Sequence, residues 1–174
     1  LIISILSTVG YETNKFNNFI ENKISENNKS VNLKLEKIKF KFDIKKFNLF
    51  LGTKTPSLKY KNQNISINSI KVYLDFISLI TSKPKINKVN ILSKEINLDQ
   101  LKNILKKTKP STLNSYIINQ VNAGEFIFNL ELYFDEDLKI NNYITKGEVR
   151  DMNTNITKDL IIKKINFNFF ADQS

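Results

Sequence analysis

Carboxylates are the main side chains in this sequence that could carry out chemistry. The 174 residues include no cysteine and no histidine. Their absence excludes thiol nucleophiles, disulfides, thiolate zinc sites and catalytic triads that need histidine. The densest carboxylate group is Asp135, Glu136 and Asp137. Three consecutive acids lack the alternating ligand spacing of a calcium-binding loop. We interpret them as a solvated turn and expect neither a catalytic residue nor a metal site.

Glycine-rich loops that hold phosphates are also missing from the sequence. The four glycines, Gly10, Gly52, Gly124 and Gly147, lie far apart. No dinucleotide-binding G-x-G-x-x-G pattern, P-loop or G-x-S-x-G nucleophile pattern occurs. We therefore predict a protein that is not an enzyme and that needs no cofactor.

The net charge of +10, from 27 basic and 17 acidic residues, is typical of proteins with an anionic partner. Lysine supplies every basic residue except Arg150, although arginine is better suited to planar recognition of bases and phosphates. Tyr60, Tyr73 and Tyr133 lie among lysines and could stack on bases, but each falls within a strand pattern. We expect no nucleic-acid partner and keep a basic nucleic-acid-binding β-domain as a third alternative.

Alternation of apolar and polar residues is the strongest structural pattern. Phe126, Phe128, Leu130, Leu132 and Phe134 occupy every second position of one segment. Such alternation places the apolar side chains on one face of a β-strand. Similar segments recur along the chain with short connections and no regular strand–helix alternation. This organisation favours an antiparallel meander over a parallel sheet.

Two positions interrupt the alternation. The apolar positions change from odd to even numbers between Leu35 and Ile38, and a second switch falls at Asn68–Ser69. A slip of one residue turns the apolar face of a strand outward unless a bulge absorbs it. We therefore predict a β-bulge at Glu36–Lys37.

Short amphipathic helices are expected over residues 13–24, 99–107 and 112–121. Thr13 and Thr112 are predicted to cap the first and the last of them, and Asp99 is predicted to start the second. Gly124 follows the last helix in the position of a helix stop. A further short helix is expected over 75–84, because Pro84 ends its pattern.

The first residues, LIISILSTVG, are apolar but too few to span a bilayer, which needs about 20 residues. We interpret residues 1–10 as the tail of an N-terminal membrane anchor, with the first turn of an ordinary helix as the alternative. Residues 11–30 are then an amphipathic helix and linker, and residues 31–174 are the sheet with inserted helices near 99–107 and 112–121. Because an unpaired edge strand is prone to associate, we expect the sheet to continue beyond Ser174.

The order of these segments resembles the N-terminal, membrane-proximal region of the AsmA-like family of bacterial envelope proteins. The first matching stretches are ETNKFNNFIENKI, VNLKLEKIKFKFDIKKFNLFL and TPSLKYKNQNISINSIKVYLDFISLITSKPKINKVNI. The later ones are YITKGEVRDMN and IKKINFNFFAD, and the strongest local element is YLDFISLITSKPKI.

The resemblance implies a β-rich α+β fold in which a curled antiparallel β-meander forms a half-pipe or groove, with two or three short amphipathic helices. It implies one N-terminal anchor in the bacterial inner membrane, with the domain in the periplasm. It also implies a part in phospholipid transport and outer-membrane biogenesis, with an architecture similar to bridge-like lipid transfer proteins. The expected partners are phospholipid or other lipid acyl chains, the inner membrane and other envelope proteins. Lys15, Lys23 and Lys29 follow the apolar start and favour the cytoplasmic side instead.

A groove floored by aliphatic and aromatic side chains would hold acyl chains through non-directional burial of apolar area. The residues predicted to line it are Leu33, Leu35, Ile38, Phe40, Phe42, Leu49, Ile65, Ile67, Val72, Leu74, Phe126, Phe128, Leu130, Leu132, Phe134, Ile165 and Phe167. The alternative is that the same residues pack against the helices as a closed core. The protein would then be a structural or scaffolding envelope domain.

Overall fold

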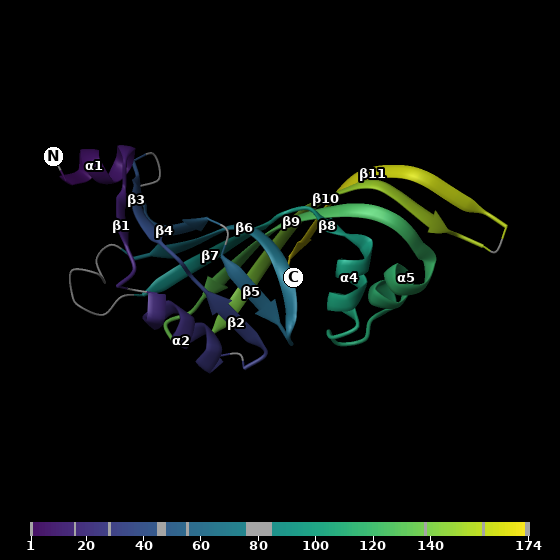
Figure 1. Ribbon diagram of the computed structural model, residues 1–174, viewed down its shortest axis with the longest axis horizontal. Helices are drawn as coiled ribbons and strands as arrows, with labels where there is room; N and C mark the ends of the chain where they lie inside the picture. The colour runs from purple at the N-terminus through teal and green to yellow at the C-terminus, as the bar shows by residue number, and fades with distance from the viewer. Residues whose placement is uncertain are drawn as a thin grey trace.

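The fold is a large antiparallel sheet with a few short helices (Figure 1). The computed structural model describes residues 2–15, 17–27, 29–44, 48–54, 56–75, 85–137, 139–157 and 159–172. Within these ranges, eleven strands form one sheet, and neighbouring strands pair antiparallel throughout. The predicted β-rich α+β class and antiparallel meander are confirmed.

The main path of the sheet runs in the order β1-β3-β4-β6-β7-β9-β10-β11. The bounds of these strands are β1 Tyr11–Thr13, β3 Ile38–Asp43, β4 Asn48–Lys54, β6 Gln63–Leu74, β7 Ile86–Ser93, β9 Val121–Phe134, β10 Ile140–Asn155 and β11 Ile161–Asp172. Three short strands lie off this path: β2 Val31–Lys34, β5 Ser57–Tyr60 and β8 Ile96–Asn97. β2 pairs with β5, β5 also pairs with β6, and β8 pairs with β9.

The sheet is twisted but not strongly curled (Figure 1). The predicted curled half-pipe is therefore wrong in its degree of curvature. Alternation decides which face each side chain takes, whereas curvature depends on strand twist and on the placement of bulges. The sequence pattern therefore predicts which face a side chain takes but says little about the curvature of the sheet.

The predicted bulge at Glu36–Lys37 is wrong, because the chain breaks there into two strands. Lys34 in β2 faces Ser57 in β5, and Ile38 in β3 faces Thr53 in β4. The link from β2 to β3 and the link from β4 to β5 contain the same number of residues between these two pairs, so neither link carries the extra residue of a bulge. The buried positions change from odd to even numbers where the pairing of β2 with β5 ends and the pairing of β3 with β4 begins.

The second parity switch coincides with a register shift in β6. Ile67 faces Ser93 in β7, but Ser69 faces Leu92, so Asn68 has no partner of its own on β7. On its other edge, β6 pairs with β5 up to Ser66 and with β4 from Ser69 onwards. The parity switch therefore lies where the strand paired with this edge of β6 changes from β5 to β4.

Helices form near the predicted positions, and α5 begins at the predicted residue, but the other ends differ by one to four residues. The described helices are α1 Ile2–Thr8, α2 Asn17–Asn27, α4 Leu98–Leu105 and α5 Thr112–Gln120. Thr13 belongs to β1 and is not a helix cap; its hydroxyl oxygen accepts a hydrogen bond from the Lys15 amide at 3.1 Å. No helix among the described residues is long and apolar enough to cross a membrane.

α4 begins one residue before Asp99, its predicted start, and the cap of α5 lies one residue before the predicted one. The Asn97 side chain accepts a hydrogen bond from the Gln100 amide at 2.9 Å, so Asp99 lies in the first turn of α4 and does not cap it. The Ser111 hydroxyl accepts from the Asn114 amide at 3.1 Å and caps α5 in place of Thr112.

Gly124 does not end a helix. α5 leads directly into β9, and Gly124 lies inside that strand with a φ of +150°. The helix expected over 75–84 falls almost wholly outside the described residues.

Two clusters of buried side chains form the interior. One contains Ile38, Ile67 and Val72 together with Ile20 of α2. The other lies under α4 and α5, where Ile96, Val121 and Phe126 meet Leu101 and Ile117. Figure 1 shows α2 at one end of the sheet and the α4–α5 pair at the other.

Candidate functional site: an apolar cavity beside α2

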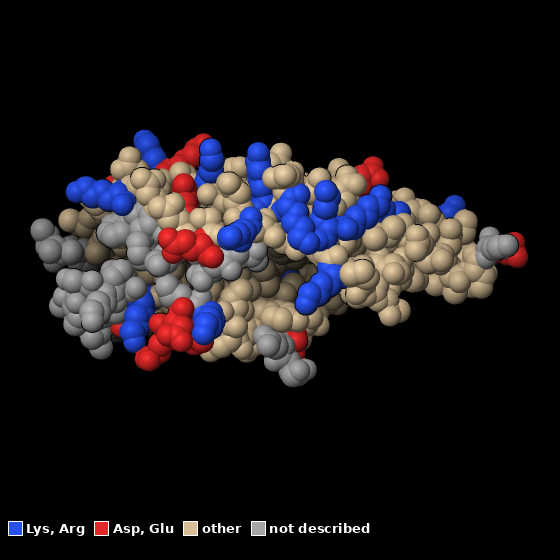
Figure 2. All heavy atoms as spheres, turned by 90° about the horizontal axis from the view of Figure 1, so that it is seen from below, with Lys and Arg blue, Asp and Glu red and all other residues tan. Residues whose placement is uncertain are grey.

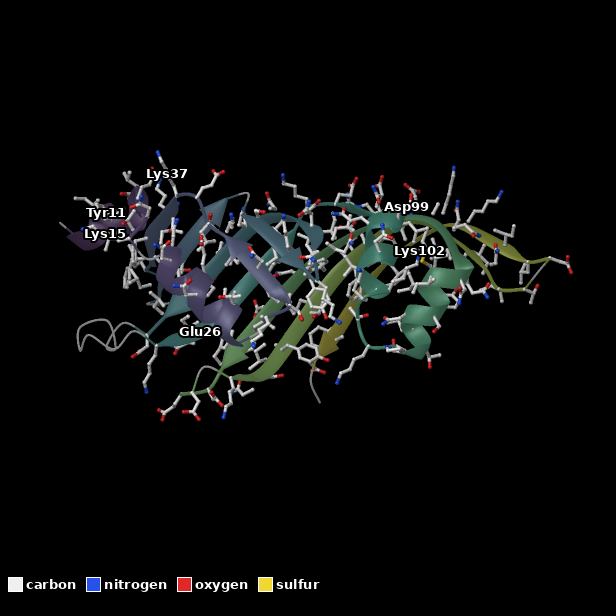
Figure 3. The ribbon with its side chains drawn as sticks, turned by 60° about the horizontal axis from the view of Figure 1, so that its bottom comes forward. Tyr11, Lys15, Glu26, Lys37, Asp99 and Lys102 are labelled. Carbon is white, nitrogen blue, oxygen red and sulfur yellow. The ribbon has the colours of Figure 1, made fainter. Side chains whose placement is uncertain are left out.

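A cavity of about 440 Å³ lies between α2, the β2–β5 pair and the faces of β6, β7 and β9. Its lining residues are Ile20, Ile24, Val31, Leu33, Leu58, Tyr60, Ile65, Ile70, Val72, Ile86, Val89, Ile91, Leu130, Leu132, Phe134, Lys139 and Ile140. All of them are apolar except Tyr60 and Lys139. In Figure 3, α2, which carries the labelled Glu26, lies across the sheet.

The floor of the cavity consists of two rows of aliphatic residues that cross three strands. In one row, Val72 faces Val89, which faces Leu132. In the other, Ile70 faces Ile91, which faces Leu130. Side chains directly opposite each other on one face of a sheet are in contact, so the two rows make a continuous apolar surface.

The opposite wall comes from the strands that leave the main path. Leu33 of β2 faces Leu58 of β5, and Leu58 faces Ile65 of β6. These three residues line the cavity from the β2–β5 side. The space therefore exists because β2 and β5 diverge from the strands that form the floor.

Polar contacts hold α2 against this wall. The Asn17 side-chain amide donates to the Leu35 carbonyl at 2.9 Å and also to the Glu36 carbonyl. The Glu21 carboxylate accepts a hydrogen bond from the Leu35 amide at 2.7 Å. These bonds attach α2 to the link between β2 and β3, and they direct Ile20, which is 2% exposed, into the interior.

The two polar residues of the lining lie at opposite ends of the strands that form the cavity. Tyr60 ends β5 beside a tight turn in which Lys61 and Asn62 have φ values of 46° and 65°. Two left-handed residues between paired strands are typical of a two-residue β-hairpin. Lys139 and Ile140 lie where the β9–β10 turn enters β10, and Ile140 is 53% exposed. The cavity is thus accessible next to the β9–β10 turn, and we call this opening its mouth.

The acidic residues expected at a solvated turn do form the β9–β10 turn. A side-chain oxygen of Asp135 accepts hydrogen bonds from the amides of Asp137 at 3.0 Å and Lys139 at 2.8 Å. Glu136 pairs with Lys85 at 3.0 Å, and Asp137 pairs with Lys139 at 3.8 Å. The acids therefore shape the turn and pair with lysines.

Six of the predicted groove residues line the cavity: Leu33, Ile65, Val72, Leu130, Leu132 and Phe134. Six others belong to the surrounding core or pack against it without lining the space: Leu35, Ile38, Phe40, Ile67, Leu74 and Phe128. The remaining five lie elsewhere: Phe42, Leu49, Phe126, Ile165 and Phe167. Phe126 belongs to the second core, and Phe167 is 42% exposed on β11.

Several residues that line the cavity were not among the predicted groove residues. Ile70, Val89 and Ile91 alternate with polar residues, and this alternation is the signal that could have included them. Ile20 and Ile24 lie on the predicted apolar stripe of a helix. Tyr60 and Lys139 have no sequence signal, because their positions beside the cavity depend on two turns that are far apart in the chain.

A polar network occupies the opposite face of the same strands. Tyr73 of β6 faces Lys88 of β7, which faces Tyr133 of β9. The Lys88 ammonium lies 4.7 Å from the Tyr73 ring centre and 5.7 Å from the Tyr133 ring centre. The Glu131 carboxylate accepts hydrogen bonds from the Tyr133 hydroxyl at 2.6 Å and from the Lys88 ammonium at 3.4 Å.

These contacts change the acidity of the groups involved. The hydrogen bond to Glu131, with smaller effects from burial and from the Glu131 charge, raises the pKa of Tyr133 to about 12. The same bond, followed by the nearby Lys88 charge, lowers the pKa of Glu131 against the opposing effect of burial. Burial, together with the Glu131 and Asp43 charges, raises the pKa of Tyr73. Tyr73 and Tyr133 thus take part in cross-strand contacts within the sheet.

The fold and the cavity together define an antiparallel β-sheet protein with an apolar cavity beside a short helix. No family model, no curated protein and no solved structure matches the chain. The relation to AsmA-like proteins therefore remains a prediction from the sequence pattern.

Proposed function

We propose that this protein binds the acyl chains of lipids in the cavity between α2, the β2–β5 pair and the sheet. The observation that carries the proposal is the lining: among the described residues that border this space of about 440 Å³, only Tyr60 and Lys139 are polar. Cavities that bind small molecules are mostly apolar and measure roughly 300–1,000 Å³. The size and the chemistry of this cavity both fall within that class.

The energetics suit a ligand made of methylene groups. Each buried methylene contributes about 0.8 kcal/mol, and aliphatic walls impose no directional contacts. A protein that releases its lipid as well as binding it benefits from such contacts, because no single hydrogen bond must be broken for the chain to slide out.

In its wider form, the proposal is of an AsmA-like module in the bacterial periplasm. It would be held to the inner membrane by an N-terminal anchor and would contribute to phospholipid transport and outer-membrane biogenesis. The support for this part is the segment order of the sequence and the apolar cavity. Its test is cell fractionation with protease accessibility in spheroplasts: protection from external protease would contradict the periplasmic location.

The direct test of binding fills the cavity. Leu130 is half-buried and lines the floor, so Leu130→Trp places a larger side chain in the space. Leu92→Trp is the matched control, because Leu92 is also half-buried but lies one residue from Ile91, on the opposite face of β7. Binding would be followed by the fluorescence of cis-parinarate and by mass spectrometry of lipids that co-purify with the protein.

We expect the unchanged protein and Leu92→Trp to bind the probe and to carry lipid, and Leu130→Trp to lose both while keeping its circular dichroism spectrum. A folded protein that carries no lipid and does not bind the probe would contradict the proposal. The scaffolding alternative would then be preferred, since Ile38 and Ile67 are already buried in one core and do not line the cavity.

A further inference from the structure

Among the described residues that line the cavity, Lys139 is the one charged side chain. It lies at the mouth, next to Ile140, whose side chain is largely exposed. A cation at the open end makes the two ends of the cavity chemically different. The apolar interior suits the hydrocarbon tail of an amphiphile, and the cation suits an anionic headgroup.

The position of Lys139 is set by the turn that precedes it. Its amide donates to the Asp135 carboxylate at 2.8 Å, and its carbonyl accepts from the Asp135 amide at 3.0 Å. The backbone of Lys139 is therefore held from both sides. The side chain, which is 76% exposed, extends from a defined point beside the mouth.

The acids of the same turn are already engaged. Glu136 pairs with Lys85 at 3.0 Å, and an Asp135 oxygen accepts two backbone amides. Asp137 lies 3.8 Å from Lys139, and both side chains are more than three-quarters exposed. An exposed ion pair of this kind contributes little stability, so an incoming anion can replace Asp137 at low cost. The turn lies at the lower edge of the molecule in Figure 1, and Figure 2 shows that face, with acidic and basic side chains next to each other.

The volume sets how many tails fit. A cavity of roughly 150 Å³ accommodates benzene, which has six carbon atoms. On the same scale, the 440 Å³ of this cavity accommodates about 18 carbon atoms. That is one long acyl chain, and a second chain of the same molecule would remain outside.

We infer that the cavity takes one long acyl chain of an amphiphile whose anionic headgroup lies against Lys139. This inference rests on the proposed function and specifies its ligand class. The anionic group is either the carboxylate of a free fatty acid or the phosphate of a single-chain phospholipid, and the two sources share the same chemistry at Lys139.

The test compares ligands with the same chain and different heads. Palmitate, palmitoyl lysophosphatidylglycerol and the neutral hexadecanol would each compete with cis-parinarate for the purified protein, and a titration would give the stoichiometry. The variant is Lys139→Gln. The matched control is Lys85→Gln, which removes a lysine that pairs with the same turn but does not line the cavity.

We expect one ligand per protein and a preference of about fivefold for the anionic ligands over hexadecanol, the upper end for a solvent-exposed ion pair. The preference should vanish in Lys139→Gln and persist in Lys85→Gln, while hexadecanol binds all three proteins alike. Which anionic ligand binds more tightly identifies the source of the head.

Equal binding of anionic and neutral ligands, equal losses in the two variants, or two chains per protein would each overturn the inference and leave the acyl-binding function standing. Failure of every ligand to bind the folded protein would instead overturn the proposed function, and the inference with it.

Discussion

At the scale of single residues, the outer face of the sheet is held together by cross-strand contacts of Tyr73, Lys88 and Tyr133. The three lie directly opposite one another across β6, β7 and β9, which brings the lysine between two rings. Glu131 completes the network through the Tyr133 hydroxyl. Lysines and tyrosines near each other in a basic sequence therefore have a structural use that composition alone does not reveal.

This network predicts an unusual tyrosine titration. Because the pKa of Tyr133 is raised to about 12 from the ordinary value of about 10, its contribution to stability is fully present below pH 10 and is lost as the pH rises through about 12. An absorbance titration should show Tyr73 and Tyr133, whose pKa values are both raised, ionising later than the other tyrosines. In Tyr133→Phe the ionisation near pH 12 should lose amplitude, and in Glu131→Gln it should move toward pH 10; an unchanged amplitude in Tyr133→Phe would contradict the assignment.

Gly147 is a second residue whose identity the packing requires. It faces Phe128 on β9 and Phe169 on β11. A Cβ atom at this position would collide with the Phe169 ring and come within 2.8 Å of the Ile127 carbonyl oxygen. The aromatic ring thus covers the glycine at the centre of the β9–β10–β11 arm.

We expect Gly147→Ala to destabilise the protein by about 1–3 kcal/mol, as overpacking does. Gly52→Ala is the control, because its nearest neighbouring atom would be 3.6 Å away, in the Phe50 ring. Urea denaturation measures both. Similar unfolding free energies for the two variants would show that Phe169 moves aside without cost.

At the scale of elements, the apolar stripe of a helix predicts where the helix lies but not the residue at which it begins. The apolar stripes predict where α2, α4 and α5 lie, but several polar residues near each start could cap it. Asn97 and Ser111 cap the helices because their backbones are extended, with φ values of −74° and −147°. Their side-chain oxygens accept a hydrogen bond from the amide three residues further along the chain. That geometry comes from the strand and loop that precede the helices.

The caps predict a difference between neighbouring residues. Asn97→Ala and Ser111→Ala should each cost about 1 kcal/mol of unfolding free energy, the usual loss for an N-cap. Thr112→Ala lies one position later in α5 and should cost much less. Chemical denaturation of the three variants checks this, and a larger loss for Thr112→Ala than for Ser111→Ala would place the cap at Thr112 after all.

At the scale of the whole molecule, the cavity spans segments that are distant in the chain. It joins Ile20 of α2, Leu58 of β5 and Leu132 of β9, together with Lys139 beyond the β9–β10 turn. A ligand that fills it touches both sides of the interior. Binding should therefore stabilise the complete fold and not a local segment.

Palmitate at about 100 times its dissociation constant should stabilise the protein by about 2.7 kcal/mol. For a protein of this size, the melting temperature should rise by roughly 5–11 °C, since each kcal/mol shifts it by about 2–4 °C. Differential scanning fluorimetry measures the shift, and Leu130→Trp should abolish it. A shift of equal size in that variant would show that palmitate acts outside the cavity.

Much of the sheet and part of the site could be predicted from the sequence. The alternation of Phe126 to Phe134 identifies β9 and its apolar face, and six predicted groove residues do line the cavity. The prediction failed at Glu36–Lys37, where parity alone cannot distinguish a bulge in one strand from a break shared by two. Ile165 and Phe167 were included because alternation identifies an apolar face but not what lies against it.

The class of fold and the buried face of a strand follow from the sequence, because side-chain alternation is a local property of an extended backbone. The departure of β2 and β5 from the main path, which opens a space above Val72, Val89 and Leu132, became visible in the three-dimensional fold. So did the position of Lys139 beside this space. Both depend on pairing between strands far apart in the chain, and no local pattern specifies which strands pair or where a sheet divides.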